Sequence, residues 1–147
     1  EYISAYFDDM LEMIKTTDFD VLSHLTCPLR YISGKYGVAV DLKEFADKTD
    51  IILKEIIDRG IALEINTSCL DTDYNFLMPD IPIIKRYKEL GGYLLTLGSD
   101  AHTAKRIAHG FDYALSELSR LGFKNLYYYK NRKPIPQARG IYSSEHF

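Results

Sequence analysis

The sequence contains no tryptophan, only two cysteines, and no apolar run near the roughly 20 residues of a membrane span. Cys27 and Cys69 stand far apart, a pattern typical of reduced thiols in a cytoplasmic protein rather than of a disulfide framework. The formal net charge of −3 argues against a surface that coats nucleic acid. The chain starts at Glu1 without a basic and apolar leader, so we expect a cytoplasmic fragment that is not secreted and contacts no membrane.

Short apolar runs alternate with amphipathic stretches along the 147 residues. A hydrophobic content of 46% and a charged content of 27% are ordinary for a folded protein, so we expect residues 1–147 to form a single domain. The alternation predicts an α/β fold of parallel strands connected by helices that cover a sheet. Helices are expected at 2–15, 41–60, 80–90 and 103–122, strands at 19–24, 61–67, 93–98 and 124–129, and an irregular tail from residue 130 onward.

Each of the first three expected strands has one apolar face and one face with small or polar side chains, since side chains alternate with a period of two. A sheet covered on both sides should be apolar on both faces, so the pattern favours a barrel with a polar mouth or a sheet with a functional face. Glu64 on such a face needs a cation, a hydrogen-bond donor or water. Val21 is expected to face the helices, and the polar faces carry Asp20, Leu22 and His24, then Ala62, Glu64 and Asn66, then Thr96, Gly98 and Asp100.

Three potential metal ligands follow the ends of these strands. Asp100 and His102 stand one residue apart after a buried strand, and His24 ends another strand. Imidazole and carboxylate groups suit a divalent zinc, iron or manganese ion. Each residue also has an ordinary structural explanation, because Asp100 could cap a following helix and His24 could form a hydrogen bond at the start of a loop. Taken together, they favour a metal site.

Other polar residues near the strand ends admit two interpretations. Arg30 lies in the loop after His24 and is either a surface charge or a guanidinium that binds phosphate. His109 is expected within a helix in a structural role, and His146 in the tail is expected to be solvated. Neither cysteine has a histidine at a spacing that indicates a nucleophile, so both are expected to be ordinary thiols.

Several short motifs occur in a fixed order along the chain: Asp20-Val-Leu-Ser-His24-Leu, Leu29-Arg30-Tyr31, Glu64-Ile-Asn66-Thr67-Ser68, Tyr87-Lys-Glu-Leu-Gly-Gly92, Gly98-Ser-Asp100-Ala-His102, Gly122-Phe123 and Asn131-Arg132-Lys133-Pro134. Together they resemble the C-terminal half of a histidinol-phosphatase of the polymerase and histidinol phosphatase (PHP) family.

The resemblance implies the C-terminal part of a distorted, TIM-like (βα)7 barrel, with up to three divalent metals at the carboxyl ends of its strands. It places His24 at the family's third metal motif, and Asp100 and His102 at its fourth. Arg30 matches a basic position that could hold phosphate, while Asn66 and Glu64 would contact substrate. The implied reaction is metal-dependent hydrolysis of L-histidinol phosphate to histidinol and phosphate in histidine biosynthesis.

The chain also departs from the family pattern. The family's His-x-His motif and its second metal motif are absent, so we expect an incomplete metal site and a fragment that is inactive alone. Cys69-Leu70-Asp71 stands where family members often carry a glycine and then an arginine. Part of a barrel would expose strand edges, which could pair with a second copy or with a missing half. Two alternatives stay open: a non-catalytic binding or assembly module with a remnant metal site, and a PHP phosphoesterase of another substrate.

Overall fold

The structure is a computed structural model that describes residues 1–138. The predicted tail residue His146 lies outside the described residues. In chain order the elements are α1 (Tyr2–Thr16), β1 (Val21–Leu22), α2 (Cys27–Leu29), the π-helix η1 (Arg30–Lys35), the 3-10 helix η2 (Leu42–Phe45), α3 (Ala46–Asp58), β2 (Ala62–Asn66), α4 (Ile81–Glu89), β3 (Leu95–Gly98), the 3-10 helix η3 (Ala104–Arg106), α5 (Phe111–Arg120), β4 (Asn125–Lys130) and β5 (Lys133–Ala138).

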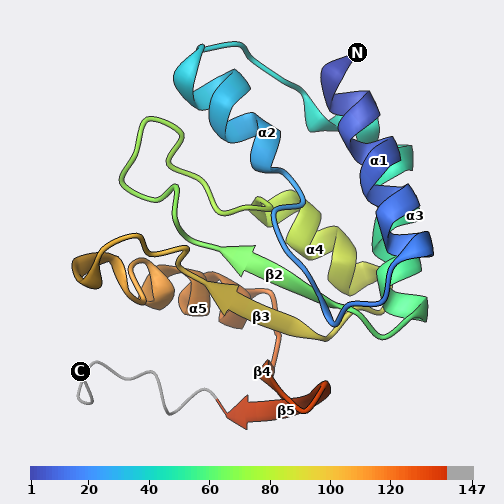
Figure 1. The fold of residues 1–147 in the computed structure, drawn as a ribbon. Helices are drawn as coiled ribbons and strands as arrows, with labels where there is room; N and C mark the ends of the chain where they lie inside the picture. The colour runs from blue at the N-terminus through green and yellow to red at the C-terminus, as the bar shows by residue number, and fades with distance from the viewer. Residues whose placement is uncertain (139–147) are drawn as a thin grey trace.

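A parallel three-stranded sheet with the order β1-β2-β3 forms the centre of the fold. The arrows of β2 and β3 point the same way in Figure 1, with α1 and α3 side by side at one edge of the molecule. Helix α3 also packs against α4 and β2. The predicted α/β architecture with parallel strands and covering helices is confirmed, whereas no closed barrel is present within residues 1–138.

The register of the sheet sets which side chains share a face. Leu63 pairs with Leu95, Glu64 with Thr96, and Asn66 with Gly98. Neighbouring residues in register point to the same side, so β2 and β3 have one apolar face and one polar face, as the sequence predicts. The apolar face joins the core, in which Leu63, Ile65 and Leu95 are fully buried.

The prediction of which β1 residue lies on the apolar face was wrong by one position. Leu22 pairs with Leu63 and Val21 with Ala62, so Leu22, not Val21, lies on the apolar face. Leu22 is buried and Val21 is half-buried. A strand of two residues carries too little alternation to fix its own faces, and pairing with β2 decides them.

The expected helix at 103–122 is also wrong in its first half. Only η3 is helical there before α5 begins at Phe111. Ala108 has a φ of +57° and Gly110, which precedes α5, has a φ of +76°, so the backbone leaves the right-handed helical region at both positions. His109 therefore lies in the connection before α5 and not within a helix.

The expected helix at 41–60 begins instead as the short η2, with Asp41 accepting a hydrogen bond from the backbone N–H of Lys43 at 3.0 Å.

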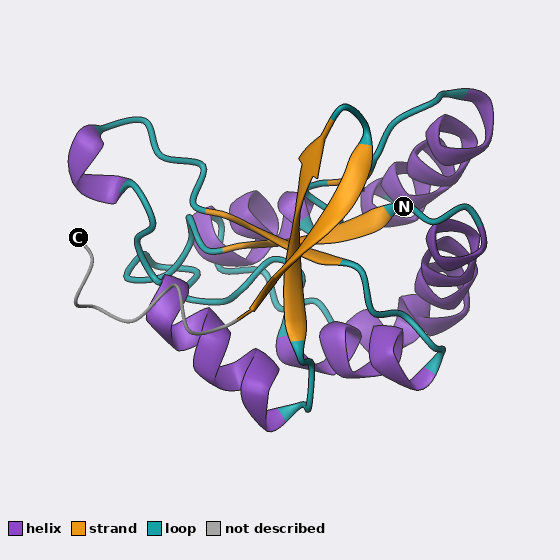
Figure 2. Cartoon of the chain, turned by 90° about the horizontal axis from the view of Figure 1, so that it is seen from below, coloured by secondary structure: helices purple, strands orange, loops and turns teal. Residues whose placement is uncertain are grey.

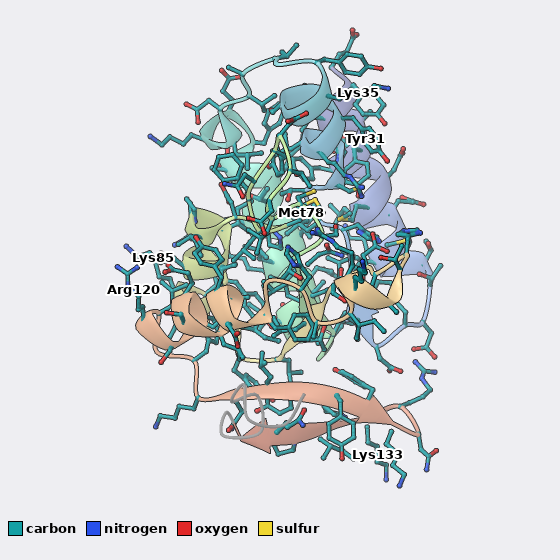
Figure 3. All side chains as sticks on the ribbon, turned by 90° about the vertical axis from the view of Figure 1, so that its left-hand side faces the viewer. Tyr31, Lys35, Met78, Lys85, Arg120 and Lys133 are labelled. Atoms are coloured by element: carbon teal, nitrogen blue, oxygen red, sulfur yellow. The ribbon has the colours of Figure 1, made fainter. Side chains whose placement is uncertain are left out.

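The predicted irregular tail forms a hairpin up to residue 138. Strands β4 and β5 are antiparallel and joined by Asn131 and Arg132, both of which have a positive φ. Figure 2 shows this hairpin crossing the parallel strands, and β4 contacts β3. In Figure 3 Lys133 lies out on the hairpin, whereas Met78 lies among packed side chains in the middle of the molecule. No helix within residues 1–138 is long and apolar enough to cross a membrane.

Candidate metal and phosphate site

The loops that follow β1, β2 and β3 carry the candidate site residues. Because the three strands are parallel, their carboxyl ends lie at one edge of the sheet, where α/β proteins usually bind ligands. His24 follows β1, Asn66 ends β2, and Asp100 and His102 follow β3. The order of the elements therefore brings segments that are far apart in the sequence to a common edge.

Arg30, Asp100 and His102 form one charged group at this edge. The Nη1 atom of Arg30 lies 4.0 Å from Oδ2 of Asp100, and Nε2 of His102 lies 3.6 Å from Oδ1 of the same carboxylate. The His102 side chain is 86% exposed, while those of Arg30 and Asp100 are 41% and 33% exposed. This carboxylate thus faces an imidazole on one side and a guanidinium on the other, and all three groups are open to a ligand from solvent.

His24 is held mainly through its backbone. Its φ is +61°, and its carbonyl oxygen accepts hydrogen bonds from the Tyr6 hydroxyl at 2.7 Å and from the N–H of Cys27 at 3.0 Å. The Nδ1 atom of His24 is buried and has no hydrogen-bond partner among the described residues. A buried imidazole nitrogen without a partner is a candidate ligand atom, because burial without a hydrogen bond costs free energy.

Glu64 and Asn66 form the polar face of β2. Asn66 is fully buried, donates to Oε2 of Glu64 at 3.4 Å and accepts from the backbone N–H of Ser68 at 2.9 Å. A Cβ atom built at Gly98 would collide with Oε1 of Glu64, so the carboxylate lies directly over this glycine. The predicted contact of Glu64 with a hydrogen-bond donor is therefore present, and the donor is Asn66.

Both cysteines lie near this group and are free thiols. Burial raises the pKa of Cys27 and of Cys69 above the ordinary thiol value; the charge of Arg30 opposes this shift and the charge of Asp100 adds to it. The sequence predicted both cysteines in loops beside the strand ends. The raised pKa favours the protonated thiol, which makes both cysteines poor nucleophiles.

The donor set fits a divalent metal in kind, but the described residues do not complete a site. No three histidine, cysteine, aspartate or glutamate side chains within residues 1–138 come together as a group that could hold a metal ion. Asp100 and His102 supply two adjacent ligand atoms of the right chemistry, and His24 has an imidazole nitrogen without a partner.

A second histidine-carboxylate pair was missed from the sequence. Nε2 of His109 lies 3.0 Å from Oδ2 of Asp71, which joins the loop after β2 to the connection before α5. The same two segments meet where the Thr67 hydroxyl donates to the carbonyl of His109 at 2.6 Å. The placement of His109 in a helix hid this pair, and the Gly110 that follows it was the available signal for a helix that begins later.

Comparisons with known proteins confirm the resemblance predicted from the sequence. The chain is 34% identical over 131 residues to a probable histidinol-phosphatase of Clostridium acetobutylicum, covering 88% of this chain and 51% of that protein. It is 33% identical over 126 residues to a probable histidinol-phosphatase of Thermotoga maritima, covering 86% and 51%. The chain thus spans about half the length of the curated relatives it matches. No protein-family model matches the chain.

A solved structure confirms the fold. The crystal structure of histidinol phosphate phosphatase from Lactococcus lactis, complexed with Zn, L-histidinol and phosphate, matches with a TM-score of 0.75 and 23% identity. The match covers 90% of this chain and 50% of that one.

Proposed function

We propose that this chain is the C-terminal half of a metal-dependent phosphatase that hydrolyses L-histidinol phosphate to histidinol and phosphate, and that it is inactive alone. The observation that carries this proposal is the meeting of Arg30, Asp100 and His102 at the carboxyl edge of a parallel sheet. Its support is the sequence similarity to proteins named histidinol-phosphatase over most of this chain. The free thiols and the absence of a membrane-spanning helix within residues 1–138 agree with a cytoplasmic location.

In this proposal residues 1–147 are a single domain that belongs to a distorted, TIM-like (βα)7 barrel. Strands β1 and β3 are the outer strands of the described parallel sheet, so each has an edge at which the barrel could continue. The partner at these edges would be the other half of the barrel or, in its absence, a second copy of the chain.

His24, Asp100 and His102 would hold a divalent zinc, manganese or iron ion together with ligands from the other half. Such an ion supplies a Lewis acid and activates water at neutral pH. Arg30 would bind the phosphate, because its planar guanidinium matches two phosphate oxygens. Its present partner is Asp100, so engagement of that carboxylate by a metal would release Arg30 toward the substrate. Asn66 and Glu64 would orient the substrate from β2.

The test combines turnover with binding. The 147-residue chain, supplied with Mn²⁺ or Zn²⁺, is expected to release little or no phosphate from L-histidinol phosphate, yet to bind both the metal and the ester in calorimetry. Arg30→Gln is expected to weaken ester binding by roughly tenfold to hundredfold, since a charge-assisted hydrogen bond contributes ~1.5–3 kcal/mol. Robust metal-dependent turnover by the chain alone would contradict the incomplete site.

The second candidate is a non-catalytic binding or assembly module. The absence, within residues 1–138, of a complete metal-binding group agrees with this module as well as with half of a shared metal site. If neither metal nor ester binds, and His24→Ala is indistinguishable from the wild type, this module is the better account.

A further inference from the structure

A cavity of about 700 Å³ lies between the segment 33–46 and the N-terminal ends of α3 and α4. None of the six candidate site residues described above lines it. Its walls are largely apolar, with Val40, Leu53 and Ile83 among the lining residues. A concave, mostly apolar cavity of this size with a few polar groups is typical of a small-molecule site.

An aromatic pair forms one wall of the cavity. The rings of Tyr74 and Phe76 lie edge to face, with their centroids 5.0 Å apart. Tyr74 is buried, whereas 56% of Phe76 is exposed, so the outer ring is open to a ligand. Aromatic faces attract both apolar groups and cations, and ammonium groups in particular.

The charged groups around the cavity leave one carboxylate oxygen without a partner among the described residues. Arg86 binds Asp50 through Nη2 to Oδ2 at 2.6 Å and Nε to Oδ1 at 2.9 Å, so these two charges offset each other. Asp41 is occupied by the backbone N–H of Lys43. The Asp80 carboxyl accepts hydrogen bonds from the backbone N–H groups of Ile83 and of Asp80 itself, while its Oδ1 atom is shielded from solvent and has no hydrogen-bond partner among the described residues.

The overall charge is also unbalanced. Three acidic side chains line the cavity, namely Asp41, Asp50 and Asp80, but only two basic ones, Lys43 and Arg86. The acidic side chains therefore outnumber the basic ones by one. A ligand with a single positive charge would balance it. A shielded carboxylate oxygen next to an aromatic pair is complementary to a protonated amine, which donates charge-assisted hydrogen bonds and contacts ring faces.

We propose that this cavity binds a small molecule with an aromatic or apolar body and one protonated amine. The amine donates to Asp80, and the body packs against Tyr74 and Phe76. None of the six candidate phosphatase-site residues lines this cavity, so the proposal does not depend on the proposed phosphatase activity.

Two probes with the same ring and different charge test this assignment: protonated 2-phenylethylamine and neutral 2-phenylethanol. Each is titrated into the 147-residue chain and followed by NMR. The amine is expected to bind saturably, with the largest shifts at Tyr74, Phe76 and Ile83, and about tenfold more tightly than the alcohol. This comparison uses the wild-type chain and needs no variant to fold.

Two variants and a control sharpen the test. Asp80→Asn is expected to weaken amine binding about tenfold, to the level of the alcohol, while leaving the affinity for the alcohol unchanged. Ala46→Phe places a ring among the cavity-lining residues and is expected to remove binding of both probes. Asp112→Asn makes the same change in the first turn of α5, outside the cavity, and is expected to change nothing.

Equal affinity for the two probes, or unchanged amine binding in Asp80→Asn, would overturn the proposal. Shifts that map away from Tyr74 and Phe76 would do the same. Self-association of the chain in sedimentation, together with no binding of the amine, would also overturn the proposal. A second copy of the chain would then be the occupant of the cavity.

Discussion

Nη1 of Arg30 lies 4.0 Å from Oδ2 of Asp100, which joins the helical segment after β1 to the loop after β3. Both side chains are partly exposed, so water screens their attraction and the contact contributes little to folding. The contact matters instead for binding. A residue proposed to bind phosphate and a residue proposed to bind metal are each other's partner when neither ligand is bound.

Replacement of Asp100 by asparagine is expected to have opposite effects on the two ligands. Metal affinity should fall by about tenfold, because an anionic ligand becomes a neutral one. Phosphate affinity of the metal-free chain should rise, because Arg30 no longer faces a carboxylate. Calorimetric titrations of Mn²⁺ and of inorganic phosphate measure both effects, with Asp112→Asn as the matched control. A parallel fall in both affinities would show that Asp100 does not compete with phosphate for Arg30.

Gly98→Ala is expected to destabilise the fold by about 1 kcal/mol or less, because the new methyl group forces the end of the flexible Glu64 side chain to move. The free energy of unfolding in urea measures the cost. In a Glu64→Ala background the same change should cost much less, since the obstructing carboxylate is gone. An equal cost in both backgrounds would place the clash elsewhere.

Thr67→Val is expected to loosen the loops after β2 and β3. The Thr67 side chain is fully buried, and its single hydroxyl proton is donated to the carbonyl of His109 at 2.6 Å, with the carbonyl of Gly98 farther away at 3.3 Å. Removal of this donor should lower the free energy of unfolding by about 1–3 kcal/mol and increase amide exchange around His109. Thr67→Ser keeps the hydroxyl and should preserve the low exchange rate; if both variants exchange equally fast, the hydrogen bond does not hold these loops.

Arg132→Gln is expected to remove a pH-dependent contribution to stability. Arg132 binds Asp18 through two hydrogen bonds of 2.7 Å and so holds the pKa of that carboxyl below its ordinary value. A carboxyl with a lowered pKa in the folded state stabilises the fold above the unfolded-state pKa of about 3.9, and this contribution is lost as the pH falls through the lower folded-state value.

The difference in unfolding free energy between the wild type and Arg132→Gln should therefore be present at pH 7, small because Asp18 is exposed, and absent at strongly acidic pH. Urea unfolding between pH 2 and pH 7 measures it, and added salt should reduce it. A difference that does not vary with pH would assign the role of Arg132 to packing of the hairpin.

The sequence predicted the parallel sheet and the faces of β2 and β3 correctly because these strands are long enough to show their alternation. Leu63 and Leu95 on one side, and Glu64 and Gly98 on the other, follow the period of two without exception. In β1 only two residues pair with the sheet, and the positive φ of His24 ends the regular alternation there. The neighbouring strand, and not the local pattern, decides how β1 faces.

The sequence does not predict the hairpin, because prolines in a tail are typical of irregular structure. Pro134 pairs with Tyr129 and Pro136 with Tyr127. In a two-residue hairpin these pairs alternate with the hydrogen-bonded ones, so neither proline needs a backbone N–H toward β4.

The site could be predicted as far as its strand ends, since residues that follow parallel strands share an edge. The contacts of Arg30 with Asp100, and of His109 with Asp71, depend on loop conformations that no local pattern encodes.

Paramagnetic Mn²⁺ tests the central claim most directly, because it broadens NMR signals of nearby nuclei. The imidazole signals of the four histidines are followed while substoichiometric Mn²⁺ is added to the chain. We expect the signals of His24 and His102 to broaden first and together, and Asp100→Asn to remove this effect. Preferential broadening of His109 beside Asp71, or identical broadening in the Asp100→Asn variant, would contradict it.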